Sequence, residues 1–280
     1  MSETVRAEDP LDLTFSEAEL EERREQITSF ISNQFEAAGA DTAVIAISGG
    51  IDSSLTSHLA VEALGVDSVY GLVLPSEVNR TDNMSDAERV AGELLGIEYD
   101  LIEISPLVEA FCAANSNVEV GAEFTGAEQV AVGNLRARIR AVLNYFAANR
   151  RGGIVLGTGN RSEAGVGYFT KYGDGAVDCH PIGNLYKQQV RQLARHIGVP
   201  DDLATKPSTA GLWEAQTDEG ELGMEYETLD SIIALHIDGP LPVSATAETI
   251  GVEAAAIERI RELYEASAHK RRAPPGPEQP

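Results

Sequence analysis

The chain alternates short apolar runs with longer segments in which apolar residues recur at helical spacing. The apolar runs are rich in β-branched residues, which is typical of strands buried on both faces of a sheet. These runs lie at 42–47, 68–74, 97–104 and 153–156. The helical segments lie at 16–38, 53–64, 80–95 and 130–146. Because strands alternate with helices, we predict an α/β fold: a parallel sheet of about five strands with helices on both faces.

The ends of the chain and one internal stretch depart from this alternation. Residues 1–15 are expected to form a loose acidic arm, after which Ser16 is a candidate N-cap for the first helix. After residue 186 the pattern is mostly helical, except that 205–223 mixes Pro, Gly, Thr and acids and predicts a long mobile loop. Residues 273–280 form a Pro-rich tail that we expect to be disordered. We therefore expect one domain over residues 16–272.

The composition excludes several classes of protein. Its two cysteines, Cys112 and Cys179, are too few for a disulfide framework or a structural zinc site. No apolar run is long enough to cross a membrane. The acidic N-terminus lacks the basic and apolar regions of a secretory signal. We therefore expect a cytoplasmic protein without a membrane partner.

The charge of the chain is strongly negative, with 45 acidic and 21 basic residues and a net charge of −24. Such a field repels nucleic acid, so we expect no nucleic-acid partner. The acids form either a surface for a basic partner or an adaptation to molar salt, in which self-repulsion is screened. Salt is favoured because the acids are spread along the chain and lysine is scarce. The four lysines are Lys171, Lys187, Lys206 and Lys270.

A glycine-rich turn after the first predicted strand carries the first chemical signal. This turn, which leads into a helix, reads Ser48-Gly49-Gly50-Ile51-Asp52-Ser53-Ser54. Adjacent glycines allow a tight turn and a close approach of an anion, and a helix N-terminus binds phosphate. Asp52, Ser53 or Ser54 is expected to cap the helix. An aspartate beside a phosphate site implies a bridging cation, with Mg²⁺ the expected one.

The stretch from Ser48 to Ser53 resembles the pyrophosphate loop of the N-type ATP pyrophosphatases. These enzymes cleave ATP between its α- and β-phosphates and adenylate a substrate oxygen. The resemblance implies a Rossmann-like adenine-nucleotide-hydrolase domain that binds ATP. The loop alone does not choose among the members of this group.

Four further segments narrow the resemblance, at 133–140, 156–163, 169–178 and 269–271. In the predicted helix at 130–146, Arg138 lies beside an apolar stripe, which favours a position facing a site. Thr158 and Glu163 follow a strand, so they are expected near Ser48 and Asp52 at the carboxyl edge of the sheet. The stripe consists of Leu135, Ile139, Val142 and Phe146.

Together these segments resemble the ammonia-dependent NAD synthetases over residues 20–272, with an archaeal-like stretch at 159–162. The resemblance implies that Asp52 and Glu163 bind Mg²⁺, and that Asp178 and Lys187 are candidate catalytic residues. Asp178 either orients the nicotinate or helps to deprotonate ammonium. The implied ATP-binding residues are Ala46, Ile47, Ser48, Gly49, Gly50, Ile51, Asp52, Ser53, Thr158, Lys187 and Thr209. The implied deamido-NAD-binding residues are Arg138, Lys171, Asp178, His269 and Lys270.

The resemblance also implies a reaction and a partner. ATP would activate the carboxylate of deamido-NAD as an acyl-adenylate, which ammonia converts to NAD, the last step of NAD biosynthesis. The chain has no room for an added amidase domain, so free ammonia or a separate ammonia supplier is expected. A homodimer is expected, with the helix at 130–146 in its interface. Two alternatives remain open at this point: another adenylating amidotransferase, such as a GMP synthetase subunit, and a nucleotide-binding stress protein.

Overall fold

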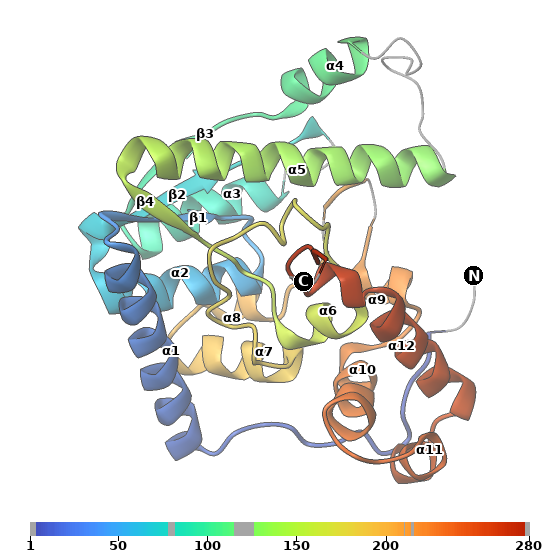
Figure 1. Ribbon diagram of the computed structural model, residues 1–280. Coiled ribbons are helices and arrows are strands. Elements are labelled where there is room, and N and C mark those ends of the chain that lie inside the picture. Colours follow the sequence, from blue (N-terminus) through green and yellow to red (C-terminus); the bar gives the residue numbers. More distant parts are fainter. Residues whose placement is uncertain (1–3, 78–81, 115–125, 210, 214–215, 278–280) are drawn as a thin grey trace.

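A parallel sheet of four strands forms the centre of the fold (Figure 1). The computed structural model describes residues 4–77, 82–114, 126–209, 211–213 and 216–277. Its neighbouring strands are all parallel, with Val44 opposite Tyr70 on one side and Val155 on the other. The predicted α/β class is therefore confirmed. In the order β3-β2-β1-β4, the strands are β1 Thr42–Ala46, β2 Val69–Val73, β3 Glu98–Leu101 and β4 Gly153–Leu156.

The expected number of about five strands is slightly too high for the described residues. On the outer side of β4, the described residues add only an isolated parallel bridge between Leu156 and Cys179. The amide of Asp178 donates to the Val155 carbonyl at 2.9 Å, and that of Gly157 donates to the Cys179 carbonyl at 2.8 Å. Pro181, two residues further on, has no N–H with which to continue the ladder.

Only Glu98–Leu101 of the predicted run at 97–104 forms a strand, and this strand is less buried than predicted. β3 stands at the end of the strand order, and Glu98, Asp100 and Leu101 are exposed. An edge strand has a neighbour on one side only, so it is not enclosed as a central strand is.

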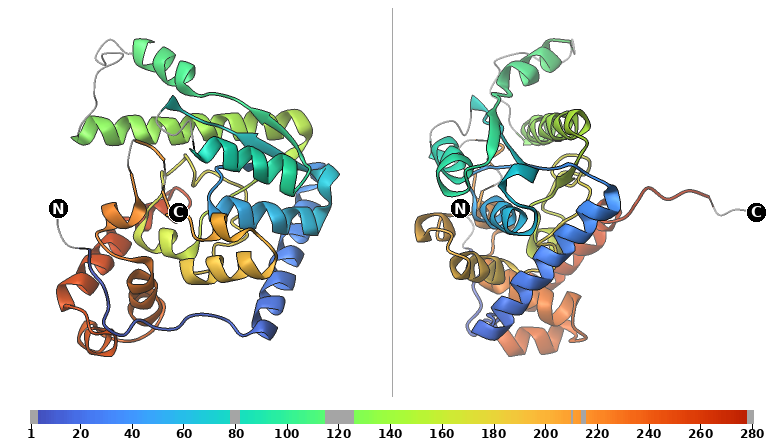
Figure 2. Two further views of the ribbon diagram at one scale, coloured as in Figure 1. Left: turned by 180° about the vertical axis from the view of Figure 1, so that it is seen from behind. Right: turned by 90° about the vertical axis from the view of Figure 1, so that its left-hand side faces the viewer.

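Helices cover both faces of the sheet (Figures 1 and 2). α1 (Glu17–Ala38), α2 (Ile51–Leu64) and α7 (Lys187–His196) share one apolar cluster with Ile45 and Ile47. α5 (Gly126–Arg151) contacts β1 and β4 on the other face. The remaining helical elements before β4 are the short 3-10 turn Val66–Ser68, α3 Asp82–Glu88, its π-helical continuation Arg89–Leu94, and α4 Ser105–Ala114.

The second half of the chain is mainly helical, as predicted. α10, α11 and α12 form a second apolar cluster to which Val166 of α6 also belongs. Part of the predicted loop at 205–223 forms α9, while residues 210, 214 and 215 lie outside the described residues. The elements are α6 Arg161–Val166, α8 Asp201–Ala204, α9 Asp218–Leu222, α10 Tyr226–Ile232 with the π-helical turn Ile233–Ile237, α11 Val243–Ile250, α12 Ala254–Ala266 and the 3-10 turn Ala268–Lys270.

The N-cap of the first helix was predicted correctly, and that of the second was not. Ser16 accepts a hydrogen bond from the Glu19 amide, and the Glu19 carboxylate accepts from Ser16 in a capping box. α2 begins at Ile51, so its N-cap is Gly50, which offers no side chain. Ser54, expected as a possible cap, instead donates from Oγ to the Gly50 carbonyl at 2.8 Å inside the first turn.

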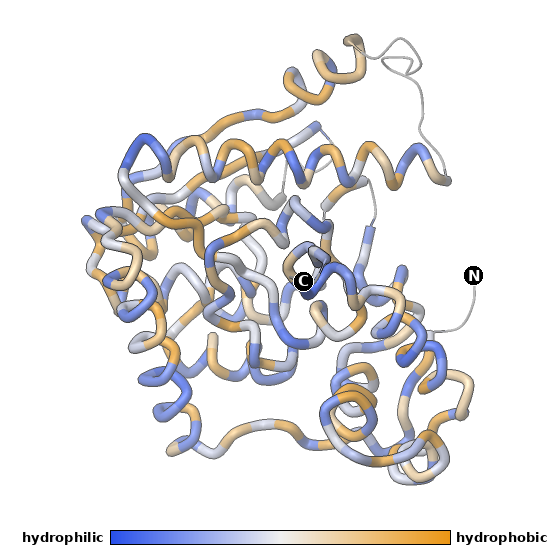
Figure 3. Tube along the Cα trace, viewed as in Figure 1, coloured by the Kyte–Doolittle hydropathy of each residue, from blue (hydrophilic) through white to orange (hydrophobic). Residues whose placement is uncertain are grey.

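The apolar stripe predicted on α5 faces the sheet only in part: Ile139 packs against a cluster that includes Val44 and Val155 of the strands, whereas two other members are exposed. Val142 is 68% exposed and Phe146 is 59% exposed. The fully buried positions of α5 are mostly small residues, of which Ala148 belongs to the cluster that contains Val44 and Val155. Figure 3 shows that apolar and polar residues alternate along α5. The buried residues are Val132, Gly133, Ala137, Ala141, Asn144 and Ala148.

The described part of the N-terminal arm, residues 4–15, is docked on the protein (Figure 1). Val5 bridges to Met224, and its amide donates to the Gly223 carbonyl at 3.0 Å. Further along, the Leu11 amide donates to Ser231 Oγ at 2.9 Å. The arm therefore lies against the α9–α10 region, rather than being loose as expected.

The C-terminal tail extends away from the rest of the chain in Figure 2. Residues 278–280 lie outside the described part, so disorder of this tail stays a prediction. None of the helices in the described residues is long and apolar enough to cross a membrane.

Candidate active site

A cavity of about 1070 Å³ opens at the carboxyl ends of β1, β2 and β4. This is the position at which open parallel sheets bind ligands. Most of the sequence-predicted site residues line it. These are Ala46, Ile47, Ser48, Gly50, Ile51, Asp52, Ser53, Thr158, Glu163, Lys171, Lys187, Thr209 and Lys270.

The glycine-rich turn is organised by two serines. Gly49 has φ +75°, a left-handed conformation that glycine adopts without strain. Ser53 Oγ accepts a hydrogen bond from the Ser48 amide at 3.2 Å and donates to the Gly50 carbonyl at 3.0 Å. These bonds fold the turn over the first residues of α2. The helix N-terminus therefore faces the cavity with its N–H groups and its positive dipole end, as a phosphate site requires.

Three charged side chains from distant parts of the chain meet beside this turn. Lys187 is only 1% exposed, and its Nζ lies 2.5 Å from Asp52 Oδ2 and 3.4 Å from Glu163 Oε1. Burial alone lowers the pKa of Lys187, but the charges of Asp52 and Glu163 outweigh it and raise the pKa. Lys187 is therefore a permanent cation at the centre of the site.

Glu163 is placed by the start of α6. Asn160 is the N-cap of this helix and forms a capping box with Glu163, while its Nδ2 donates to Asp52 Oδ1 at 2.8 Å. Burial and the charge of Asp52 raise the pKa of Glu163 to about 8, although the Lys187 ammonium opposes the shift. The role of Asn160 was not predicted, although an Asn three residues before a Glu is a recognisable capping signal.

Asp52 and Glu163 have the donor chemistry of a magnesium site. Both carboxylates contact the Lys187 ammonium and both line the cavity, so a hard cation that uses them as ligands would bind beside that nitrogen, on the cavity side. The described residues contain no group of three or more His, Cys, Asp or Glu side chains arranged around one point. Mg²⁺ commonly binds in this way, through one or two carboxylates together with substrate phosphates and water.

The predicted residues for the second substrate form a separate group. Arg138 donates to the Lys171 carbonyl at 3.3 Å, and Lys171 Nζ lies 3.5 Å from His269 Nδ1. Lys270 Nζ donates to the carbonyls of Gly167 and Phe169, at 2.7 and 2.8 Å. The structure thus brings these four residues into one region, with Lys171 and Lys270 lining the cavity.

Asp178 has a different environment from the one expected. Its Oδ2 accepts from the Val155 amide at 2.7 Å, and its Oδ1 accepts from Tyr145 Oη at 3.3 Å. Asp178 is absent from the cavity lining, as are Gly49, Arg138 and His269. Its carboxylate therefore stabilises the backbone near the end of β4. A substrate contact at Asp178 stays a prediction.

Three polar side chains join the site without an assigned role in the sequence analysis. Asp218 is 3% exposed, accepts from Tyr226 Oη at 2.8 Å, and has no hydrogen-bond partner at Oδ1 among the described residues. The Tyr226 ring centroid lies 5.1 Å from Lys187 Nζ. Arg140 donates to the Leu74 carbonyl at 3.0 Å, and burial lowers its pKa to about 10. Arg140 lies in the segment 133–140 that carries the resemblance, but the contacts of all three residues form only after folding, so the sequence assigned them no role.

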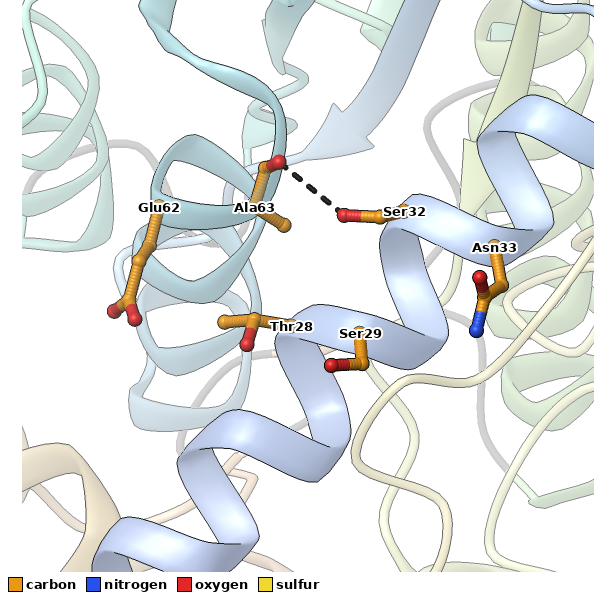
Figure 4. A pocket seen from close by; sticks show the side chains of 6 residues that line it. All are labelled: Thr28, Ser29, Ser32, Asn33, Glu62 and Ala63. Carbon is orange, nitrogen blue, oxygen red and sulfur yellow. Dashed lines mark hydrogen bonds between the residues drawn. The ribbon is translucent and has the colours of Figure 1, made fainter.

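A second hollow, of about 350 Å³, lies between α1 and α2 (Figure 4). It is shallow and polar, and Ser32 Oγ donates to the Ala63 carbonyl at 3.2 Å on its wall. Its other lining residues are Thr28, Ser29, Asn33 and Glu62. This set contains no cationic side chain that could bind a phosphate, so we assign the chemistry to the larger cavity.

Comparisons with known proteins agree with this geometry. The chain is 58% identical to an NH(3)-dependent NAD(+) synthetase of Halobacterium salinarum, over 96% of this chain and 97% of that protein. Among solved structures, an NMN synthetase from Francisella tularensis superimposes with a TM-score of 0.79 at 36% identity, covering 94% of this chain and 99% of that one. An NH3-dependent NAD synthetase from Campylobacter jejuni reaches a TM-score of 0.73 at 27% identity, covering 92% and 99%.

The family described as NAD synthase matches residues 23–274 of the chain. That match spans both the glycine-rich turn and the segment that carries His269 and Lys270. Together with the relatives above, this match favours NAD synthase over the other adenylating amidotransferases that share the turn. It also excludes a simple nucleotide-binding module. The chain belongs to the NAD synthase family.

Proposed function

We propose that this protein is a ligase that joins ammonia to the carboxylate of deamido-NAD, using ATP and releasing NAD, AMP and pyrophosphate. The observation that carries the proposal is the contact of Lys187 with Asp52 and Glu163 beside a phosphate-binding turn. The relatives named as NH(3)-dependent NAD(+) synthetases support it. This activity would be the final step of NAD biosynthesis, and we place it in the cytoplasm.

ATP would occupy the part of the cavity next to the glycine-rich turn. The N–H groups at the start of α2 would hold its phosphates, and Lys187 would stand beside the leaving pyrophosphate. Thr158 and Thr209 line the same cavity and are proposed ATP contacts. Mg²⁺ held by Asp52 and Glu163 would neutralise the phosphate charge.

The dinucleotide would extend toward Lys171 and Lys270. These lysines, with Arg138 and His269, supply positive charge in a chain whose net charge is −24. The positive charge would hold the pyrophosphate bridge and the carboxylate of deamido-NAD. Asp178, beside β4, is proposed to act on the nicotinate end by orienting it or by helping to deprotonate ammonium.

The reaction would proceed in two displacements. A carboxylate oxygen of deamido-NAD attacks the α-phosphorus of ATP, and the bond to the bridging oxygen breaks as pyrophosphate leaves. The lone pair of ammonia then attacks the acyl carbon, AMP leaves with its oxygen, and a proton is lost from nitrogen. The protein contributes mainly alignment and charge stabilisation, because it forms no covalent bond in either step.

We also propose that the protein is a homodimer, joined through α4 and α5. Five large apolar side chains on these helices are exposed, and exposed apolar side chains of this size are typical of an interface. They are Leu107, Phe111, Val130, Val142 and Phe146. A Phe146→Glu variant should then sediment as a monomer under conditions in which the unchanged protein is a dimer.

A second substrate is a specific alternative, because the Francisella protein of the same fold is described as an NMN synthetase. That name concerns a mononucleotide product, whereas the more similar relatives are described as NAD(+) synthetases. A direct competition between nicotinic acid mononucleotide and deamido-NAD would separate the two activities. Preference for the mononucleotide would replace the dinucleotide in our proposal.

The deciding experiment measures NAD formation by the purified protein from deamido-NAD, ATP and Mg²⁺. Ammonium should support turnover, and glutamine alone should not. Pyrophosphate and NAD should appear in equal amounts. Robust turnover with glutamine in an ammonia-free preparation would contradict the proposed nitrogen source, and absence of NAD with either nitrogen source would contradict the activity itself.

A further inference from the structure

We propose that Asp230 and Ser162 form a positioning pair that aligns Lys187 with Glu163. The inference rests on the roles proposed above for these two charged residues. Asp230 lies in α10 and is fully buried, at 0% exposure. It does not line the cavity, so it would act through the residues it holds.

Asp230 connects the first turns of two helices. Its Oδ1 accepts a hydrogen bond from Ser162 Oγ in α6, and its Oδ2 accepts from the Gln188 amide in α7 at 3.0 Å. Ser162 Oγ in turn accepts from the Lys187 amide at 2.9 Å. One carboxylate and one hydroxyl thus join the starts of α6 and α7.

Each of these contacts lies next to a charged site residue. Ser162 directly precedes Glu163, and Gln188 directly follows Lys187. Both pairs of neighbours lie inside helices, where the peptide units are planar and φ and ψ are set, so fixing one residue fixes the direction in which the adjacent charged side chain leaves the backbone. The pair therefore sets the relation between Lys187 Nζ and Glu163 Oε1, which lie 3.4 Å apart.

The burial of Asp230 argues that the carboxylate has a specific task. Burial raises its pKa to about 6, although the hydrogen bonds from Ser162 and from the α7 backbone oppose the shift. A buried carboxylate is costly unless its oxygens accept hydrogen bonds, and both oxygens of Asp230 do so. The N-termini of α6 and α7 add positive dipole ends that favour a negative charge at this point.

α10 contacts or positions both ends of Lys187, the ammonium group and the backbone. Tyr226 lies one turn before Asp230, and its ring faces the ammonium end of Lys187 at 5.1 Å. Asp230 holds the backbone end of the same residue, through Ser162 and the neighbouring amide. A lysine that is held at both ends has little freedom to reorient. A displacement of about 1 Å in such a group can lower the rate on the order of 100-fold.

The test replaces Asp230 by Asn, which keeps the volume but turns one acceptor oxygen into an N–H donor. Ser162→Ala removes the hydroxyl and serves as the second variant if D230N does not fold. The measurements are kcat for pyrophosphate release per ATP-binding site, counted by equilibrium binding, and KM for ATP. Counting sites removes any contribution from unfolded protein.

Ser231→Ala is the matched control. Ser231 is adjacent to Asp230 and equally buried, but its Oγ accepts from the Leu11 amide and donates to the Glu227 carbonyl at 2.7 Å. It can therefore lower stability without touching α6 or α7. We expect S231A to keep kcat per site within about twofold, as for a buried change outside the network.

We expect D230N and S162A each to lower kcat per site by about 10- to 100-fold, the usual effect of losing a supporting hydrogen bond. KM for ATP should change by less than about threefold, because the loss arises in the transition state. The double variant should be no slower than the slower single one, since the residues act as one unit. Independent, multiplying losses or a kcat matching that of S231A would overturn the proposal.

Lys187→Met, assayed in parallel, separates this inference from the proposed function. An inactive K187M beside a fully active D230N would refute the positioning pair alone. A K187M variant with unchanged activity would refute the role of Lys187, and the positioning pair with it.

Discussion

Lys187 Nζ and Asp52 Oδ2 lie 2.5 Å apart, although 135 residues separate them in the chain. The ammonium is buried and the carboxylate is 18% exposed, so the pair joins the interior to the cavity wall. Asp52 belongs to the first turn of α2 and Lys187 is the first residue of α7. Their contact brings the starts of two helices to one point, at which we place the leaving pyrophosphate of ATP.

Asp52→Asn should lower the rate of pyrophosphate release by more than about 100-fold, the scale of losing one preorganised charge. It should also reduce stability, because Lys187 would remain buried with only Glu163 as its counter-ion; complete unpairing of a buried charge costs about 3–5 kcal/mol, which is the upper limit for this variant. Rapid-quench assays and urea melts would measure the two effects. A folded variant of near-normal rate would remove Asp52 from the proposed metal site.

Deletion of residues 1–13 should destabilise the protein by on the order of 3 kcal/mol, since several hydrogen bonds of roughly 1 kcal/mol each disappear. Val5 and Leu11 also lose their packing against the α10–α12 cluster. Urea unfolding would measure the change. Arg6→Ala is the control, because its ion pair with Glu225 involves a 72% exposed arginine and should contribute little. An unchanged midpoint after deletion would mean that the arm does not support the fold.

The segment 205–223 should be cut by protease in the free protein and protected by ATP with deamido-NAD. Lys206 and Thr209 line the cavity, so ligands would hold this segment over the site and exclude water from the acyl-adenylate. Peptide mapping after limited digestion would locate the cuts. Cleavage at the same rate in both states would argue against a closing segment.

Stability and activity should both rise with KCl into the molar range. A net charge of −24 repels itself and the anionic substrates at low ionic strength, where screening extends over roughly 10–30 Å. Thermal melts and initial rates across a KCl series would test this expectation. A melting temperature that is flat or falling between dilute buffer and molar KCl would favour the alternative, a surface for a basic partner.

Acidification below pH 6.5 should destabilise the fold in part through His58. Burial lowers the pKa of His58, although its hydrogen bond to the Ser54 carbonyl opposes the shift. The unfolded chain therefore takes up this proton at a higher pH than the folded protein, and stability falls as the pH falls through the unfolded value. His58→Gln should reduce the difference between the melting temperatures measured at pH 7.5 and pH 5.5. An equal difference in both proteins would exclude His58 as a cause.

Local patterns in the sequence determined the class of the fold and the phosphate-binding turn. Short apolar runs alternating with helical spacing required a parallel sheet, because such strands can be buried only when helices cover both faces. The adjacent Gly49 and Gly50, followed by Asp52, predicted a turn at the end of β1. This prediction was possible because the backbone freedom of glycine acts within a few residues. The capping box of Ser16 and Glu19 was equally local, and it was predicted correctly at its N-cap.

Contacts between distant segments could be decided only by the tertiary structure. Which residues of α5 are buried depended on the elements that pack against the helix. Its small residues became buried, whereas Val142 and Phe146 stayed exposed. Asp230 carries no signal in its own segment, because its function arises only when α6, α7 and α10 meet. Hydrogen bonds between buried groups depend on positions set by the whole core, whereas propensities and turns depend on neighbours along the chain.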